Sequence, residues 1–377
     1  MRVAIDGRAI QDHFPGIGRY VYNLTRALAR LPERPDLTLL YDPTRWSSRF
    51  ALGALAGVEL LPAPYTPFDW RSQRAIPRRL RAADVDLYHS PYYLMPYWSG
   101  RPTVVTLYDT IPLIYPQYLP SGAARRAYRW LNLLAGRRAR RILAISASAA
   151  GDIARHLHIP AGRIVVTPLA ADERFRPLPD RAAVDAWRRA AGLPSIYVLY
   201  LGINKPHKNL VTLIRAWKLA LERGLEAAGD SPALVLAGRE DPRYPQTRRA
   251  ALEAGAGSRI IFLGDVAEDD LPWLYNAATL FVYPSVYEGF GLPVLEAMAC
   301  GTPVACSNTS SLPEVAGDAA LLVEPLDIEG WAAALGRLLA DAEQRRELAR
   351  RGLAQAARFS WERTARQTLG AYHAALG

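Results

Sequence analysis

Residues 283–304 read YPSVYEGFGLPVLEAMACGTPV, a stretch that joins a short apolar run to a helical pattern through a loop with two glycines. Pro293 suits the first turn of the helix, and Gly301 suits its end. A strand, a loop and a helix in this order form the repeating unit of parallel α/β sheets, which bind ligands where their strands end. The stretch therefore predicts an α/β fold with a ligand site in this loop.

The same loop carries residue types that suit an anionic sugar ligand. Gly289 and Gly291 allow backbone N–H groups to approach an anion just ahead of the helix, whose dipole adds to the attraction. Glu288 and Glu296 lie eight residues apart at the same strand end, where carboxylates beside a phosphate suit sugar hydroxyls. An ordinary strand, loop and helix with solvent-facing acids has the same spacing, so the spacing alone leaves both interpretations open.

A second loop is basic. Gly202 ends a predicted strand, and Lys205, His207 and Lys208 follow it, before a helix for which Asn209 is the expected N-cap. These cations would neutralise a diphosphate and stabilise it as a leaving group. A solvated charge run is the alternative interpretation. The position of the loop, at the first strand of the same domain as the glycine loop, favours the diphosphate site.

The first half of the chain offers two weaker signals. Gly16 and Gly18 follow the first predicted strand and precede a helix, but the third glycine of a dinucleotide-binding fingerprint is missing. We expect this pair to permit close backbone approach to a ligand. Asp109 follows the strand predicted over 103–108; it either acts on an acceptor hydroxyl, by orientation or proton transfer, or caps a turn.

The alternation of β-branched runs and helical patterns breaks at a proline-bearing segment, 172–179, and then starts again. We therefore predict α/β architecture with two Rossmann-like parallel-sheet domains facing across a cleft that holds the site. The first covers 1–180 and is completed by a C-terminal helix at 360–377; the second covers 181–359. The predicted strands are 3–6, 37–41, 85–89, 103–108, 142–145, 164–167, 196–201, 233–237, 260–263, 280–283, 304–306 and 320–323. The predicted helices are 18–30, 121–138, 147–158, one from about 209, 329–340, 342–358 and 360–375.

The composition narrows the class of protein. With 377 residues, half of them apolar and 22% charged, the chain is globular and long enough for two domains. No apolar run approaches the roughly 18 residues of a membrane span, and Asp6 stands where a signal peptide needs an apolar stretch, so we expect a cytoplasmic protein. Cys300 and Cys306 are expected to be buried reduced thiols, because a metal site needs more ligands.

The positive charge is concentrated in the first half. Residues 1–185 have a balance of +11, whereas residues 186–377 have a balance of −1. This asymmetry indicates either solvated helix faces or an anionic partner; no zinc-finger, homeodomain or RNA-binding signature accompanies it, so we expect no nucleic acid. Arginines with aromatic residues on one helix suit contact with anionic lipid instead. The basic residues of that helix region are Arg125, Arg126, Arg129, Arg137, Arg138, Arg140 and Arg141, and its aromatic residues are Tyr128 and Trp130.

In order along nearly the whole chain, these segments resemble the retaining glycosyltransferases of family four, also called glycosyl transferases group 1. Residues 283–304 are similar to the E-x7-E signature of that family. The resemblance implies the GT-B architecture, a donor site mainly in the second domain, and no catalytic metal or other cofactor. The supporting matches are 16–20, 146–152, 264–266 and 310–317.

Residue by residue, the resemblance implies a donor site for a sugar nucleotide. Glu296 would bind the ribose, and Glu288 with the loop amides would hold the transferred sugar. Lys208 would neutralise the diphosphate, which Gly16 or Gly18 would approach from the other domain. The expected catalytic residues are Asp109, Glu288 and Lys208, and the expected donor-binding residues are Gly16, Gly18, Gly202, Lys205, His207, Lys208, Gly264, Glu288, Gly289, Phe290, Gly291, Leu292 and Glu296.

Two positions depart from the family pattern. The family often has arginine where His207 stands, so Lys205 is a candidate for the missing cation. The family also often has histidine where Tyr108 stands, which removes an expected role at position 108 but leaves that of Asp109 in place.

The resemblance implies transfer of a hexose from a nucleotide-diphosphate sugar, GDP-mannose or a UDP-hexose, to a hydroxyl. The acceptor would be a glycan, a glycolipid or a lipid-linked precursor of the cell envelope. A location in the cytoplasm, peripheral on the inner face of the plasma membrane, fits the basic first half. Two other enzyme classes share such a scaffold: sugar-nucleotide epimerases and NAD-dependent oxidoreductases.

Overall fold

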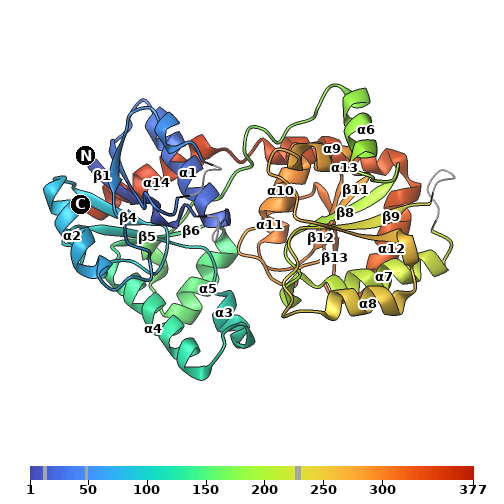
Figure 1. Ribbon diagram of the computed structural model, residues 1–377, viewed down its shortest axis with the longest axis horizontal. Helices are drawn as coiled ribbons and strands as arrows, with labels where there is room; N and C mark the ends of the chain where they lie inside the picture. The colour runs from blue at the N-terminus through green and yellow to red at the C-terminus, as the bar shows by residue number, and fades with distance from the viewer. Residues whose placement is uncertain (12–14, 47–49, 226–230) are drawn as a thin grey trace. The chain divides into compact units, whose positions relative to one another are not determined.

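The computed structural model describes residues 1–11, 15–46, 50–225 and 231–377. They form two compact units: unit 1 comprises Met1–Leu169 with Ser360–Gly377, and unit 2 comprises Ala170–Phe359. Each unit has a parallel β-sheet with helices packed on its faces (Figure 1). The predicted α/β fold class is confirmed.

In unit 1, the described residues form a seven-stranded sheet in the order β3-β2-β1-β4-β5-β6-β7. All its strand pairs are parallel. The strands are β1 (Arg2–Asp6), β2 (Asp36–Tyr41), β3 (Val58–Pro62), β4 (Leu87–Ser90), β5 (Thr103–Leu107), β6 (Arg141–Ala144) and β7 (Ile164–Val166). The helices are α1 (Pro15–Arg30), α2 (Ser72–Ala82), α3 (Ile111–Ile114), α4 (Gly122–Arg138), α5 (Ala147–Leu157) and α14 (Trp361–Leu376).

In unit 2, the described strands form a six-stranded parallel sheet in the order β10-β9-β8-β11-β12-β13. They are β8 (Tyr197–Leu201), β9 (Ala233–Ala237), β10 (Ile260–Gly264), β11 (Leu280–Tyr283), β12 (Val304–Ser307) and β13 (Ala320–Val323). The helices are α6 (Arg181–Ala190), α7 (Leu210–Glu222), α8 (Gln246–Ala254), α9 (Leu271–Ala277), α10 (Leu292–Ala299), α11 (Leu312–Ala316), α12 (Ile328–Ala340) and α13 (Ala342–Ala356).

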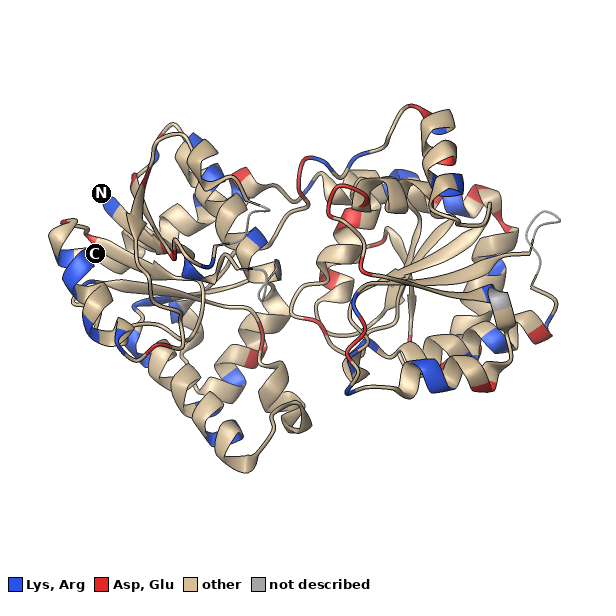
Figure 2. Cartoon of the chain, in the orientation of Figure 1, with Lys and Arg blue, Asp and Glu red and all other residues tan. Residues whose placement is uncertain are grey.

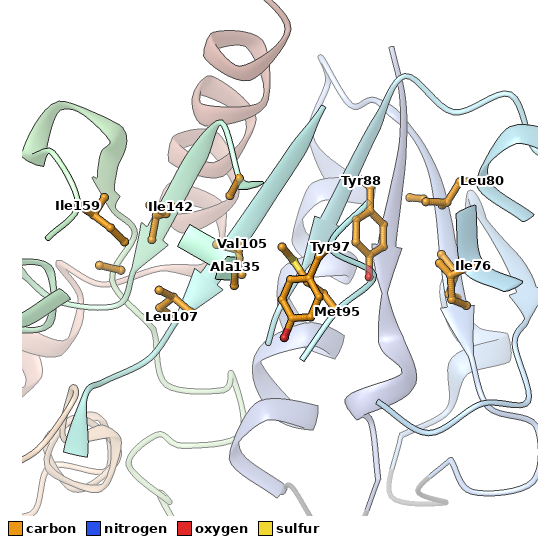
Figure 3. Packing of buried hydrophobic residues seen from close by; sticks show 14 of the residues in the cluster. Ile76, Leu80, Tyr88, Met95, Tyr97, Val105, Leu107, Ala135, Ile142 and Ile159 are labelled. Carbon is orange, nitrogen blue, oxygen red and sulfur yellow. The ribbon is translucent and has the colours of Figure 1, made fainter. Parts of the chain in front are cut away.

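The central strands are short apolar runs because helices cover both faces of each sheet. In unit 1, Ile76 and Leu80 of α2 and Val105 of β5 belong to one cluster of fully buried side chains, with Ile142 of β6 (Figure 3). Burying one such side chain contributes about 1.5–3 kcal/mol, so this core holds the sheet and its helices in a fixed arrangement.

The predicted strands and the long predicted helices are confirmed, with ends that move by up to three residues. Among the elements that the pattern did not predict are β3 and α2. The edge strand β3 is only partly buried and ends in Pro62, so it lacks the apolar run of a central strand. Helix α2 contains Pro77 and four arginines, so its sequence lacks a clear helical pattern of apolar residues.

The units divide at Leu169, ahead of the proline-bearing segment at which the sequence suggested the break. That segment packs on unit 2. The backbone N–H of Leu178 donates to Oδ1 of Asn276 over 2.9 Å, and Nδ2 of Asn276 donates to the carbonyl of Arg176 over 3.0 Å. These hydrogen bonds place the segment in unit 2 and not between the units.

The C-terminal helix α14 returns to unit 1, where a buried histidine bonds to it. Nδ1 of His89 lies 2.7 Å from the Tyr372 hydroxyl, and Nε2 lies 2.8 Å from Oγ1 of Thr106. The ring is completely buried, and burial lowers the pKa of His89 to about 3. The ring is therefore neutral at physiological pH, with both nitrogens in contact with hydroxyl groups.

Acid should destabilise unit 1 through this histidine. The folded pKa is below the ordinary value of about 6.5, so the unfolded state takes up a proton first as the pH falls. At pH 5 this proton uptake lowers the free energy of unfolding of unit 1 by about 2 kcal/mol. Denaturant unfolding at pH 7.5 and pH 5.0 measures how much the free energy of unfolding falls with acid. This fall should be smaller for His89→Gln than for the parent chain. The exposed His373→Gln variant is the control; equal acid losses in all three proteins would contradict the prediction.

Candidate functional site

The two loops that the sequence singled out in the second half lie side by side. Strand β8 pairs with β11, although some 80 residues separate them in the sequence, and the strand order reverses at this pair. Open α/β sheets bind ligands at such a switch point, beyond the carboxyl ends of the strands. Residues 202–209 follow β8 and residues 284–291 follow β11, so the sheet brings both loops to this position.

An ion pair joins the two loops. Nζ of Lys208 lies 2.6 Å from Oε1 of Glu288 and donates to the Tyr283 hydroxyl over 2.9 Å. The side chains of Lys208 and Glu288 are only 13% and 9% exposed. Burial raises the pKa of Glu288, but the positive charge of Lys208 and the hydrogen bonds of the carboxylate outweigh burial, so the pKa of Glu288 lies below its ordinary value. The site thus holds a carboxylate and an ammonium group in contact.

Two stacked tyrosine rings from the central strands β8 and β11 lie next to this ion pair. The Lys208 ammonium lies 5.2 Å from the centre of the Tyr283 ring, which stacks on Tyr200 with ring centres 5.9 Å apart. A cation over an aromatic face is electrostatically favourable, more so when it is removed from water. Lys208 is therefore held by two contacts, one with the Tyr283 ring of the sheet and one with the Glu288 carboxylate.

Asn209 is the N-cap residue of α7, as predicted, but its side chain is used elsewhere. It adopts a left-handed conformation with φ of 58°, and its side chain makes no capping hydrogen bond to α7. Instead its amide donates to the carbonyl of Pro284 over 3.0 Å and to that of Pro325 over 2.6 Å, while Thr212 donates to its oxygen. The predicted position is thus confirmed, but the side chain joins the basic loop to the end of β11 and to the loop before α12 and does not cap the helix.

The glycine loop is held by two serines that sequence reasoning assigned only to the family match. The hydroxyl of Ser311 donates to the carbonyls of Glu288 and Phe290, and Oγ of Ser310 accepts from the Glu288 N–H over 2.9 Å. Gly291, at φ of 96°, is the N-cap of α10, and a Cβ there would meet the Leu312 side chain at 2.5 Å. The start of α11 and the loop before it therefore shape the predicted anion-binding turn.

Glu296 lies inside α10 and is 2% exposed. Its Oε2 accepts a hydrogen bond from the Tyr275 hydroxyl over 2.9 Å, and burial, followed by the charge of Glu296, raises the pKa of Tyr275 well above its ordinary value. The carboxylate is therefore fixed by α9.

Cys300 and Cys306 are buried and unbridged, as predicted.

Glycines end the three strands on the β8 side of the switch point. The N–H of Gly202 donates to Ala237 and that of Gly238 to Gly264, over 2.9 and 2.7 Å. A Cβ on Gly238 would lie 2.6 Å from the Gly202 carbonyl oxygen, so the backbones need glycine to approach this closely. Gly238 was missed by sequence reasoning because a single glycine after a strand carries no distinctive pattern.

The basic loop has fewer positive charges than its sequence suggests. His207 is 5% exposed, and burial, followed by the charge of Lys208, lowers the pKa of His207 to about 4. Its ring is therefore neutral near pH 7. Lys205 and Lys208, two of the three lysines in the chain, remain as the cations of this loop.

The remaining predicted residues belong to unit 1. Gly16 is exposed and Gly18 is buried in the first turn of α1. Asp109 is partly exposed after β5, and its Oδ1 accepts a hydrogen bond from the Ile111 N–H over 2.9 Å. The carboxylate therefore caps the turn that starts α3, one of the two roles that the sequence left open. Tyr108 beside it is partly exposed, but its hydroxyl is buried and has no hydrogen-bond partner among the described residues.

Metal-ligating side chains do not cluster in the described part of the chain: no group of three or more His, Cys, Asp or Glu residues could hold a metal ion there. The groups gathered at the switch point of unit 2 are instead a lysine, a carboxylate, a tyrosine hydroxyl and a glycine turn. This set can bind an anion next to a polyhydroxylated group.

Comparison with known proteins agrees with this chemistry. The model of glycosyl transferases group 1 matches residues 184–355, and that of glycosyltransferase family 4 matches residues 15–175. O-antigen chain mannosyltransferase B of Escherichia coli is 34% identical over 388 residues, covering 99% of each chain. The serotype-specific mannosyltransferase WbdA of Escherichia coli is 37% identical over 268 residues, 70% of this chain and 32% of that protein.

Among solved structures, the Anabaena protein Alr3699/HepE in complex with UDP and glucose has a TM-score of 0.76 at 19% identity, covering 99% of both chains. The fold and the site define a two-domain α/β glycosyltransferase of the GT-B class. The chain belongs to the group 1, family 4 glycosyltransferases, and it is a hexosyltransferase. The matches give no support to an epimerase or an oxidoreductase.

The ion pair gives a prediction for stability. Lys208→Met leaves the buried Glu288 without its cation and should cost about 3 kcal/mol in the free energy of unfolding of unit 2. The double variant with Glu288→Gln should lose less than the sum of the two single variants, because it leaves no unpaired charge. Denaturant unfolding of the four proteins measures this coupling. Additive losses would show that the two side chains do not stabilise each other.

Proposed function

We propose that the chain is a retaining mannosyltransferase that takes mannose from a sugar nucleotide, GDP-mannose in first place and a UDP-hexose as the alternative donor. The observation that carries the donor site is the buried contact of Lys208 with Glu288 at the switch point of unit 2. The choice of mannose rests on the names of the relatives, an O-antigen chain mannosyltransferase and a serotype-specific mannosyltransferase. The same names support an acceptor in a cell-envelope glycan.

In this proposal the donor binds across the two loops. Lys208, with Lys205, neutralises the diphosphate, and the amides from Gly289 to Leu292 lie at the start of α10, where the helix dipole favours an anion. Glu288 holds hydroxyls of the transferred sugar. Glu296, fixed by Tyr275, accepts from the ribose. Gly202 follows β8, which leads into the basic loop, and Gly264 ends β10 of the same sheet. Gly16 and Gly18 of unit 1 stay predicted contacts of the donor.

The reaction needs charge stabilisation more than a protein nucleophile. As the bond from the anomeric carbon to the diphosphate oxygen breaks, the sugar gains oxocarbenium character and the lysines take up the negative charge of the leaving group. The acceptor hydroxyl, oriented by Asp109, attacks from the same face, and its proton passes to the departing phosphate oxygen. We propose that these groups carry out the transfer and that no metal or other cofactor takes part.

This donor site is tested by transfer of radiolabelled mannose in the presence of EDTA. The parent chain should be active with GDP-mannose, which should raise its melting temperature more than UDP-, ADP- or TDP-sugars do. Lys208→Ala, Glu288→Ala and Glu296→Ala should each lower the rate about 100-fold or more, since each removes a charged contact to the donor. Lys218→Ala and Glu343→Ala change exposed residues of the same types and should keep the parental rate. Full activity in the three site variants would overturn the assignment.

We further propose that unit 1 contacts an anionic membrane surface, where a lipid-linked acceptor would lie, from the cytoplasmic side. Helix α4 exposes Trp130, which is 64% exposed, and nearby Trp98 is 60% exposed with the Arg138 guanidinium 4.7 Å from its ring centre. Basic residues lie along α2 and α4 (Figure 2). In the described residues, no helix has the length and apolar character that crossing a membrane requires.

Membrane contact predicts that the chain co-sediments with vesicles containing phosphatidylglycerol at low salt and not with phosphatidylcholine vesicles. Replacement of Arg125, Arg126 and Arg129 by Gln should weaken binding at least tenfold, because each basic residue near the surface contributes about 1 kcal/mol. The control replaces Arg346, Arg350 and Arg351 of unit 2 by Gln, an equal change of net charge. Absence of binding at low salt, or equal losses in both variants, would contradict the proposal.

A further inference from the structure

A group of tyrosines in unit 1 has no part in the donor site. Tyr92 and Tyr93 follow β4, Asp109 follows β5, and Tyr128 lies on α4. Strand β4 pairs with both β1 and β5, and the order of the unit 1 sheet reverses between β1 and β4. These residues therefore gather at the carboxyl ends of the strands, at the switch point of unit 1, where such a sheet binds a ligand.

The side chains contact one another at short range. The rings of Tyr92 and Tyr93 have centres 4.4 Å apart, and those of Tyr93 and Tyr128 lie 5.1 Å apart at 72°. A hydrogen bond joins the hydroxyl groups of Tyr92 and Tyr93. Asp109 follows β5, the neighbour of β4, so its carboxylate comes from the same edge of the sheet as Tyr92 and Tyr93. Burial raises the pKa of Tyr92 and of Tyr128, and the negative charge of Asp109 adds to both shifts.

These tyrosines differ from those of the core. Tyr88 is fully buried and Tyr97 is 8% exposed, whereas Tyr92, Tyr93 and Tyr128 are each partly exposed (Figure 3 shows the buried pair). Their cluster combines aromatic faces with hydroxyl groups and a carboxylate. A sugar ring is complementary to this combination, because its apolar C–H face can pack on an aromatic ring while its hydroxyls bond to phenol and carboxylate oxygens. An acyl chain would need an apolar groove without a carboxylate.

We propose that Tyr92, Tyr93 and Tyr128 form, with Asp109, the subsite for the terminal sugar ring of the acceptor. The acceptor is thus a saccharide whose sugar, and not its lipid, is recognised by this cluster. The ring would lie on the tyrosine faces while Asp109, already oriented by the Ile111 N–H, accepts from the attacking hydroxyl. This inference rests on the proposed function, because it makes the cluster the acceptor side of the same reaction.

The test uses the full chain with α-mannobiose as the acceptor. Tyr128→Phe removes one hydroxyl and Tyr93→Leu removes the central ring; each should raise the KM for mannobiose at least tenfold. The KM for GDP-mannose, and the slow hydrolysis of the donor without an acceptor, should stay within twofold of the parent values. The control is Tyr22→Phe, a change on α1 that keeps the ring in contact with Phe50. Melting curves establish that each variant is folded.

The outcomes separate the two proposals. Acceptor KM values that stay at the parental level in both folded variants would overturn the subsite. A parent chain that neither transfers mannose nor hydrolyses the donor would overturn the proposed function instead. Saturation-transfer NMR with mannobiose alone then still tests the cluster. Signals present with the parent and lost with Tyr93→Leu support the subsite, whereas an unchanged or absent parental signal counts against it.

Discussion

The contact between Lys208 and Glu288 is the interaction on which the rest of the site in unit 2 depends. An isolated lysine or glutamate removed from water would be strongly destabilised, so each side chain holds the other in place. Tyr283 and Asn209 extend this contact into the sheet and into the neighbouring loops. A ligand that displaces one partner of the pair must compensate the charge that remains. A diphosphate would offer negative charge to the lysine, and sugar hydroxyls would donate hydrogen bonds to the carboxylate.

The two units use the same principle with different chemistry. Each places its polar loops at the switch point of a parallel sheet, so that residues distant in sequence become neighbours. In unit 2 these loops carry lysines and a glycine turn, which suit a diphosphate. In unit 1 they carry tyrosines and Asp109, which suit an uncharged saccharide. This division of donor and acceptor chemistry is what a transferase of two substrates requires.

Much of this was predictable from the sequence because its signals are local. Strand runs such as 233–237, the position of Pro293 and the glycine turn depend on neighbouring residues only. Other features depend on partners far along the chain. Asn209 was expected to cap a helix, but Pro325, more than a hundred residues later, accepts from its amide. The low pKa of His207 is likewise a consequence of burial, which residue spacing does not reveal.

The sequence by itself determined the α/β class, the family and the loops that carry chemistry, because periodicity, glycine turns and a long signature are written in consecutive residues. Only the tertiary structure decided which groups meet. It paired Lys208 with Glu288, made Asp109 the cap of a turn, and brought the serines before α11 to the glycine loop. The physical reason is that strand order in a parallel sheet is set by packing across the whole domain, and strand order decides which loops become neighbours.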